Sequence, residues 1–157
     1  MFDGWKRLIR KLEDSRGYIS LMVDGEDLGS LEQGIWASPT LGTVIRNNDK
    51  FAYEGGQVVY KGQEDVIVRL NYYQSVELDG VVQATVAGTC GVNSVVDDTY
   101  TISNSSTFGG NIDVINEATL EISNGDTIDV FIKQDTQAQA NVTIVKGLYH
   151  IQIIDVI

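Results

Sequence analysis

The chain has 157 residues, of which 43% are hydrophobic and 21% charged, and its formal net charge is −11. These values are typical of one globular domain with its own core, and no stretch of about 18 apolar residues predicts a membrane span. Residues 1–16 hold five basic and three acidic side chains, whereas the remainder holds six basic and nineteen acidic ones. Because an acidic body repels phosphate backbones, we expect no nucleic-acid partner and no membrane partner.

Residues 1–16 predict a short amphipathic helix, separate from a domain at residues 17–157. Its apolar residues recur at helical spacing: Phe2, Trp5, Leu8, Ile9 and Leu12. Its basic residues lie mainly on the other face: Lys6, Arg7, Arg10 and Lys11. We expect a helix over residues 3–15 that stops at Gly17. It either docks on the domain or on other copies, or lies on a membrane surface; we favour docking, because so short a helix needs a partner surface.

From Gly17 onward the pattern changes to β-branched residues separated by glycine and polar turns, which predicts an all-β body. We expect strands at Tyr18–Val23, Gly34–Ala37, Gly42–Arg46, Gln57–Lys61, Asp65–Leu78, Val81–Val86, Tyr100–Ser103, Asn111–Val114, Thr119–Ser123, Thr127–Lys133, Asn141–Val145 and Leu148–Val156. Asp79-Gly80 predicts a hairpin with a type I′ turn, and Asn124-Gly125-Asp126 predicts a second tight turn. Many short strands at similar spacing indicate an antiparallel β-sandwich or jelly roll.

The end of the chain alternates between apolar and polar residues up to the last positions. Such a C-terminal strand must be paired to be ordered, so we expect it inside a sheet or at a contact between subunits. Three polar stretches, residues 88–99, 103–110 and 134–140, predict loops, where binding residues tend to lie.

The residues that catalysis or metal binding would need are sparse. Cys90 is the only cysteine and no hydrolase motif surrounds it, so a buried apolar role is expected. His150 is the only histidine, in an alternating strand, and no motif joins it to a catalytic serine. Residues 24–27 and Asp97-Asp98 could offer oxygen ligands to calcium, but their spacing is that of solvated turns. We therefore expect no enzyme activity, no metal and no cofactor.

Three stretches together resemble the jelly roll of the tumour necrosis factor (TNF) and complement globular-head superfamily. They are the glycine- and aromatic-rich residues 51–73, the Leu-Glu-Ile-Ser-Asn-Gly-Asp-Thr-Ile segment that begins at Leu120, and the last strand from Leu148. Small structural proteins of tailed phages, including decoration and fibre-head proteins, are similar in fold, in acidity and in their few cysteines. The resemblance covers roughly residues 43–157.

The resemblance implies a closed homotrimer in which the strand around residues 65–73 and the terminal strand line the threefold axis. The expected interface residues are Tyr72, Tyr73, Tyr149 and Ile151. Tyrosine combines apolar area with a polar tip, which suits an axis that is partly wet. The alternative is a monomeric sandwich in which these are ordinary core or surface residues.

The resemblance also implies a role in a virus particle. We interpret the chain as a virion structural protein, assembled in the host cytoplasm, that decorates a phage capsid as a trimer and stabilises the head. Its partner would be the major capsid protein or another virion protein. The expected contact residues are those of the N-terminal helix: Trp5, Lys6, Arg7, Leu8, Ile9, Arg10, Lys11 and Leu12. Two alternatives remain: a receptor- or carbohydrate-binding fibre head that uses the three loops, and a glycosidase with paired carboxylates.

Overall fold

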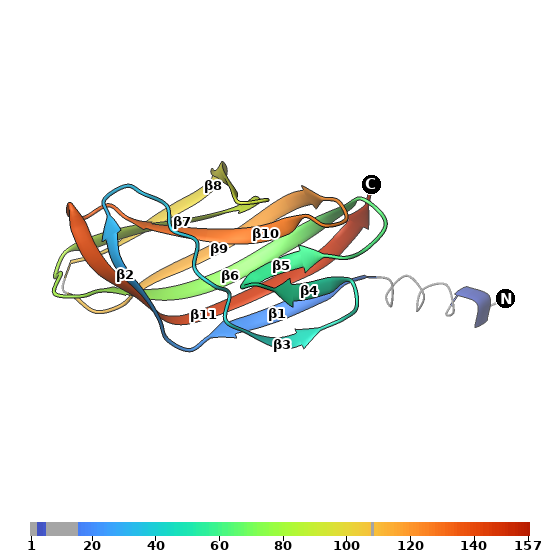
Figure 1. The fold of residues 1–157 in the computed structure, drawn as a ribbon, viewed down its shortest axis with the longest axis horizontal. Helices are drawn as coiled ribbons and strands as arrows, with labels where there is room; N and C mark the ends of the chain where they lie inside the picture. The colour runs from blue at the N-terminus through green and yellow to red at the C-terminus, as the bar shows by residue number, and fades with distance from the viewer. Residues whose placement is uncertain (1–2, 6–15, 108) are drawn as a thin grey trace.

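The structure is a computed structural model that describes residues 3–5, 16–107 and 109–157. Within these residues it is almost entirely β (Figure 1). The strands are β1 (Tyr18–Val23), β2 (Glu26–Glu32), β3 (Thr43–Asn47), β4 (Phe51–Glu54), β5 (Gln57–Tyr60), β6 (Val66–Leu78), β7 (Ala84–Val92), β8 (Val95–Ser106), β9 (Ile112–Ile122), β10 (Thr127–Gln134) and β11 (Gln139–Val156).

The strands form two antiparallel sheets packed face to face. The six-stranded sheet, here sheet A, has the order β3-β1-β11-β6-β9, with β2 also paired to β11. The other sheet, sheet B, has the order β4-β5-β10-β7-β8. After β5 the chain changes sheet at almost every connection, so neighbours in sequence are seldom neighbours in a sheet. This is the topology of a jelly roll, which confirms the predicted fold class.

The C-terminal strand β11 lies at the centre of sheet A. One edge of β11 pairs with β6 along most of its length. The other edge pairs first with β2 and then with β1, so that two strands share it. The prediction that the end of the chain is paired in a sheet is therefore confirmed.

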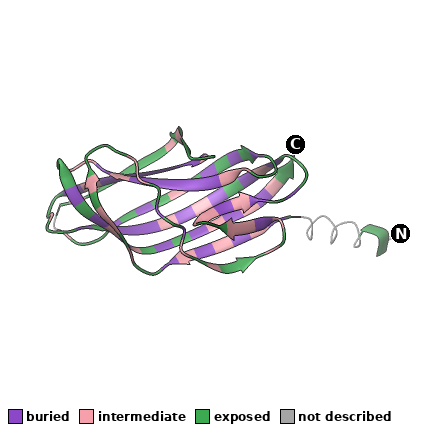
Figure 2. Ribbon diagram, viewed as in Figure 1, coloured by how far each residue is buried: buried purple, intermediate pink, exposed green. Residues whose placement is uncertain are grey.

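The core lies between the two sheets and follows from the two-residue period of the strands. In β6, Val66, Val68, Leu70 and Tyr72 are buried, while the intervening residues are partly or fully exposed. Figure 2 shows the same alternation of buried and exposed positions along most strands of sheet A. Side chains on one parity thus enter the core and those on the other form the outer face of the sheet.

The Asp79-Gly80 turn exists, but the predicted hairpin does not. Val81 N–H donates to the Leu78 carbonyl at 3.3 Å and Gly80 has a φ of 70°, but the φ of Asp79 is not positive, so the turn is not of the predicted type I′. However, β6 before it belongs to sheet A and β7 after it to sheet B. The turn therefore carries the chain across the sandwich. The predicted turn at Asn124-Gly125-Asp126 is confirmed, and it too joins the two sheets.

Several predicted strand boundaries were wrong, for identifiable reasons. Two predicted strands merge into β9, because Asn116 inside it donates from its amide to the Tyr100 carbonyl and to the Tyr72 hydroxyl. Two more merge into β11 across Gly147, where a Cβ would come within 3.0 Å of the Tyr149 ring atoms. The predicted strand at residues 34–37 is a single bridge from Ala37 to Ile132. The strands β2 and β4 were not predicted, because β2 is largely polar and β4 is short and only partly buried.

Only the start of the predicted N-terminal helix can be compared with the structure. Residues 3–5 are helical, while residues 6–15 lie outside the described residues. In the part of the chain that is described, no helix has the length and apolar character needed to cross a membrane.

Candidate functional site

A row of apolar side chains crosses the outer face of sheet A. The register aligns Met22 of β1 with Leu148 of β11, Leu148 with Tyr73 of β6, and Tyr73 with Ile115 of β9. Leu148 is 42% exposed and Ile115 64% exposed. Ile45, from the bulged edge strand β3, is exposed as well. We call these five side chains the apolar face.

A polar row runs beside the apolar face. Arg46 of β3 pairs with Ser20 of β1, Ser20 with His150 of β11, His150 with Asn71 of β6, and Asn71 with Glu117 of β9. The Ser20 Oγ and His150 Nδ1 atoms are 2.7 Å apart, within hydrogen-bonding distance. The polar row therefore places a histidine at the centre of the sheet.

All members of the two rows except Met22 and Arg46 line a hollow of about 740 Å³ over the middle of sheet A. Leu21, Tyr72, Tyr149 and Ile102 of β8 also contribute to the lining of this hollow. Few charges lie among these side chains, so the hollow presents mainly apolar surface. Single exposed apolar residues are ordinary, but a contiguous group on one face is typical of a contact surface.

Few charges act on the polar row. Arg69 of β6 forms an ion pair with Glu117 at 3.2 Å, and both side chains are exposed, so this pair contributes little to stability. Burial first, and the Arg46 charge second, lower the pKa of His150 below its ordinary value. His150 is therefore neutral at neutral pH.

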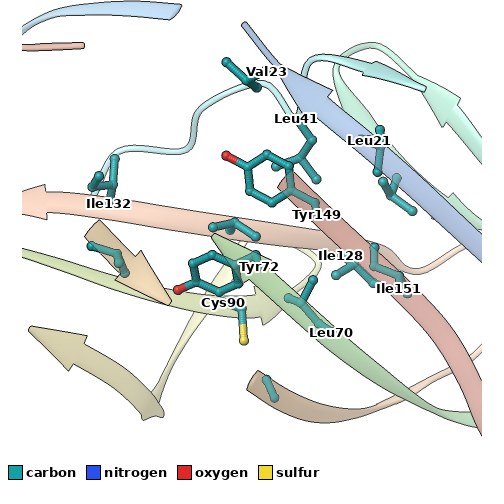
Figure 3. Packing of buried hydrophobic residues seen from close by; sticks show 14 of the residues in the cluster. Leu21, Val23, Leu41, Leu70, Tyr72, Cys90, Ile128, Ile132, Tyr149 and Ile151 are labelled. Carbon is teal, nitrogen blue, oxygen red and sulfur yellow. The ribbon is translucent and has the colours of Figure 1, made fainter. Parts of the chain in front are cut away.

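Of the four predicted interface residues, three lie in the core. Tyr72, Tyr149 and Ile151 are at most 3% exposed, whereas Tyr73 belongs to the apolar face. Figure 3 shows the first three among buried side chains of both sheets. Because Tyr72 and Tyr73 are consecutive in a strand, they must point to opposite faces, so one chain's surface offers only Tyr73 to a partner.

The two core tyrosines are held by specific contacts. Their rings stack with centroids 6.1 Å apart. The Gln74 amide donates to the Tyr149 hydroxyl at 2.8 Å, and the Asn116 amide donates to the Tyr72 hydroxyl at 3.2 Å. Burial raises the pKa of both phenols above the ordinary tyrosine value. These hydroxyls thus act as structural hydrogen-bond partners inside the sandwich.

Of the eight predicted N-terminal contact residues, the structure describes only Trp5. Trp5 is 64% exposed. The other seven, Lys6, Arg7, Leu8, Ile9, Arg10, Lys11 and Leu12, lie outside the described residues. Their role in binding stays a prediction.

One of the three predicted loops is largely strand, and the first half of a second one is strand as well. Residues 88–99 comprise the end of β7, a turn at Asn93-Ser94 and the start of β8, and β8 continues to Ser106. Asn93 and Ser94 have φ values of 55° and 62°, as a two-residue hairpin turn requires. The hairpin therefore joins β7 to β8 here, and none lies at residues 79–80. The third stretch does contain a connection, between β10 and β11.

The chemistry of the other singled-out residues follows from burial. Cys90 is completely buried, and burial raises the pKa of its thiol to about 12, so it is protonated at neutral pH. The Ser20–His150 pair joins residues 130 positions apart, which sequence analysis did not anticipate. Among the described residues, no carboxylate is hydrogen-bonded to the His150 ring, and no cluster of three metal-ligating side chains occurs.

Most of the apolar face was not predicted from the sequence. Leu148 and Ile115 occupy positions on the polar parity of their strands, next to His150 and Glu117. An apolar residue on the otherwise polar parity was the available signal, but which strands lie side by side could not be known from it.

Several solved structures share this fold at low sequence identity. The PRD1 vertex protein P5 is 7% identical, with a TM-score of 0.59 over 87% of this chain and 95% of that chain. Eiger TNF from S. frugiperda is 13% identical, with a TM-score of 0.52 over 88% and 93%. The globular domain of zebrafish complement 1qA protein is 9% identical, with a TM-score of 0.50 over 91% and 100%.

No protein-family model matches the chain, and no curated protein matches it. At these identities the similarity to solved structures establishes the fold alone. The chain has a TNF-like jelly-roll fold, as the sequence resemblance predicted.

Proposed function

We propose that the chain is a virion structural protein: a homotrimer that assembles through the outer face of sheet A and decorates a phage head by binding the major capsid protein or another virion protein. The observation that carries the proposal is the apolar face, on a TNF-like jelly roll similar to the PRD1 vertex protein P5. The role is binding alone, without a catalytic step, and it is exercised in the virion.

The apolar face supports assembly between copies. It spans the central strands β1, β11 and β6, with β9 at one edge and β3 at the other, and its side chains remain in contact with water in the single chain. The resemblance to TNF-like trimers implies that the terminal strand lines the threefold axis, and β11 is the central strand of this sheet. Closing a trimer over this face would remove its apolar side chains from water.

The N-terminal segment supports attachment to a larger partner. Residues 1–16 are basic and carry an apolar stripe in sequence, whereas the rest of the chain is acidic. One trimer would present three such segments, and simultaneous contacts raise the effective concentration at the capsid surface. Deletion of residues 1–16 is therefore expected to abolish co-sedimentation with capsids of the virus that encodes the chain, while the trimer persists.

Solution mass and a surface substitution test the assembly. Light scattering of the full chain is expected to give three times 17.2 kDa, about 52 kDa. Leu148→Asp places a charge on the apolar face and should cost about 2 kcal/mol or more per contact, which leaves a folded monomer. Val82→Asp is the matched control, because Val82 is 63% exposed in the connection between β6 and β7. A full chain that is monomeric, or a trimer that Leu148→Asp leaves intact, would contradict the assembly proposal.

A further inference from the structure

The only histidine of the chain lies at the centre of the proposed interface. His150 is on the outward side of β11, with β1 and β6 on either side and β3 and β9 at the edges. It belongs to the polar row, directly beside the apolar face, and it lines the hollow together with Leu148. Any partner that covers this face also covers His150.

The groups around the ring offer no counter-charge of their own to a protonated imidazole. Ser20, on β1, and Asn71, on β6, are its neutral register partners. The titratable and charged groups that face it from the adjoining strands are Tyr18 of β1, Arg46 of β3, Arg69 and Tyr73 of β6, and Glu117 of β9. The one carboxylate in this set is already paired with a guanidinium, that of Arg69.

These surroundings favour the uncharged ring. Burial and the nearby Arg46 charge lower the pKa of His150 within the single chain. Covering the face with another copy removes more water from the ring, and this penalises the charged form further. A closed trimer would also bring three copies of the ring into one interface, where three positive charges repel one another.

On the basis of the proposed trimer, we propose that His150 makes assembly pH-dependent: the trimer requires uncharged imidazoles and dissociates when the rings take up protons. The proposal rests on the position of His150 in the apolar hollow and on the lack of a free carboxylate beside it in the described residues. It gives the chain an acid-triggered release from its own assembly.

The direction follows from proton counting. In the trimer the His150 ring is neutral. Once the pH falls below the pKa that His150 has in the free subunit, each trimer subunit therefore binds fewer protons than a free subunit does. Association therefore weakens as the pH falls through that pKa and is unaffected well above it. Each subunit can lower the association constant by at most about tenfold per pH unit. The association constant of a trimer therefore falls by up to about a thousandfold per pH unit.

Sedimentation velocity of the full chain tests this between about pH 7.5 and about pH 5, where histidine is the side chain that titrates. The wild-type trimer is expected to dissociate toward the acidic end, while the His150→Gln trimer persists, because glutamine is neutral throughout. A wild-type trimer that is unchanged or strengthened on acidification, or a His150→Gln trimer that dissociates equally, overturns the proposal and leaves the trimer itself standing. A wild type that is monomeric at the neutral end removes the proposed function together with this inference.

A second measurement does not depend on how the His150 variant folds. Because the chain has one histidine, its imidazole gives a single set of ring signals in the NMR spectrum. Titration of the wild-type chain at a concentration where the trimer is populated is expected to show a lower His150 pKa than titration of the same chain diluted until it is monomeric, in which the face stays open. Equal pKa values in the two samples, or a higher value in the trimer, overturn the proposal.

Discussion

The outer faces of the two sheets differ in how far the chain itself buries their outward side chains. On sheet B, outward Asp129 and Phe131 of β10 are at most 5% exposed, because other parts of the same chain cover or bind them. On sheet A, outward Leu148 and Ile115 remain exposed over the hollow. Within the described residues, Asp129 and Phe131 of sheet B are thus covered by the chain itself, whereas Leu148 and Ile115 of sheet A stay open to solvent.

Sheet B also shows how a buried charge is satisfied internally. The Asp129 carboxylate accepts hydrogen bonds from the Gln57 amide at 3.0 Å, the Ser94 N–H at 2.8 Å and the Thr127 hydroxyl at 3.2 Å. These contacts join β5, the turn before β8, and β10. Nearby, the Lys133 ammonium lies 4.7 Å from the centre of the Trp36 ring, so the segment before β3 also packs on this sheet. The comparison predicts that substitutions on sheet B change stability and those on the outer face of sheet A change assembly.

The largest effect is expected from the core beneath sheet A. Ile151→Ala removes a completely buried side chain and should lower the free energy of unfolding by about 2–5 kcal/mol. Ile115→Ala is a matched control on the apolar face, with an expected change within about 0.5 kcal/mol. Both are made in the Leu148→Asp background and compared by urea denaturation, so that assembly does not contribute. Equal effects of the two alanines would show that Ile151 is not a core residue of the single chain.

A smaller effect is expected on the outer face of sheet B. Asp129→Ala leaves three hydrogen-bond donors without their acceptor, which should cost about 1–3 kcal/mol of unfolding free energy. Asp98→Ala, at an exposed position of β8, is the control and should change it by less than about 0.5 kcal/mol. Both variants should keep the wild-type mass in light scattering. A changed mass for Asp129→Ala would mean that sheet B, too, takes part in assembly.

The fold could be predicted from sequence to a useful extent, because alternation is local. The predicted strand at residues 18–23 coincides with β1, since its buried and partly buried positions alternate without interruption. The hairpin at residues 79–80 was wrong because turn chemistry fixes a change of direction but not the sheet that the next strand joins. Asn116 and Gly147 read as strand breaks in sequence, but Asn116 is bonded to the Tyr100 carbonyl of β8 and Gly147 makes room for the Tyr149 ring, so both lie inside long strands.

The candidate site could be predicted only in part, because it depends on which strands are neighbours. Sequence placed the expected interface near residues 72–73 and on the last strand, and both segments lie in sheet A, the sheet that carries the apolar face. It could not decide which of Tyr72 and Tyr73 faces out, because the pairing with β9 and β11 settles that. It also could not bring Ser20 to His150, because they come from the two ends of the domain. The local pattern therefore identifies segments of sheet A, and the long-range pairing of strands decides which of their side chains face outward.

The smallest effect is expected from two tyrosine hydroxyls that lie on opposite sides of sheet A. Tyr149→Phe removes the acceptor of the buried Gln74 amide, whose own oxygen has no partner in the described residues, and should cost about 1 kcal/mol of unfolding free energy. Tyr73→Phe removes only an exposed bond to Asp113 at 3.1 Å and should cost less than about 0.5 kcal/mol. Urea denaturation in the Leu148→Asp background measures both. A larger loss for Tyr73→Phe would mean that the outer face of sheet A stabilises the single chain. The predicted difference between the core side and the outer side of sheet A would then be wrong.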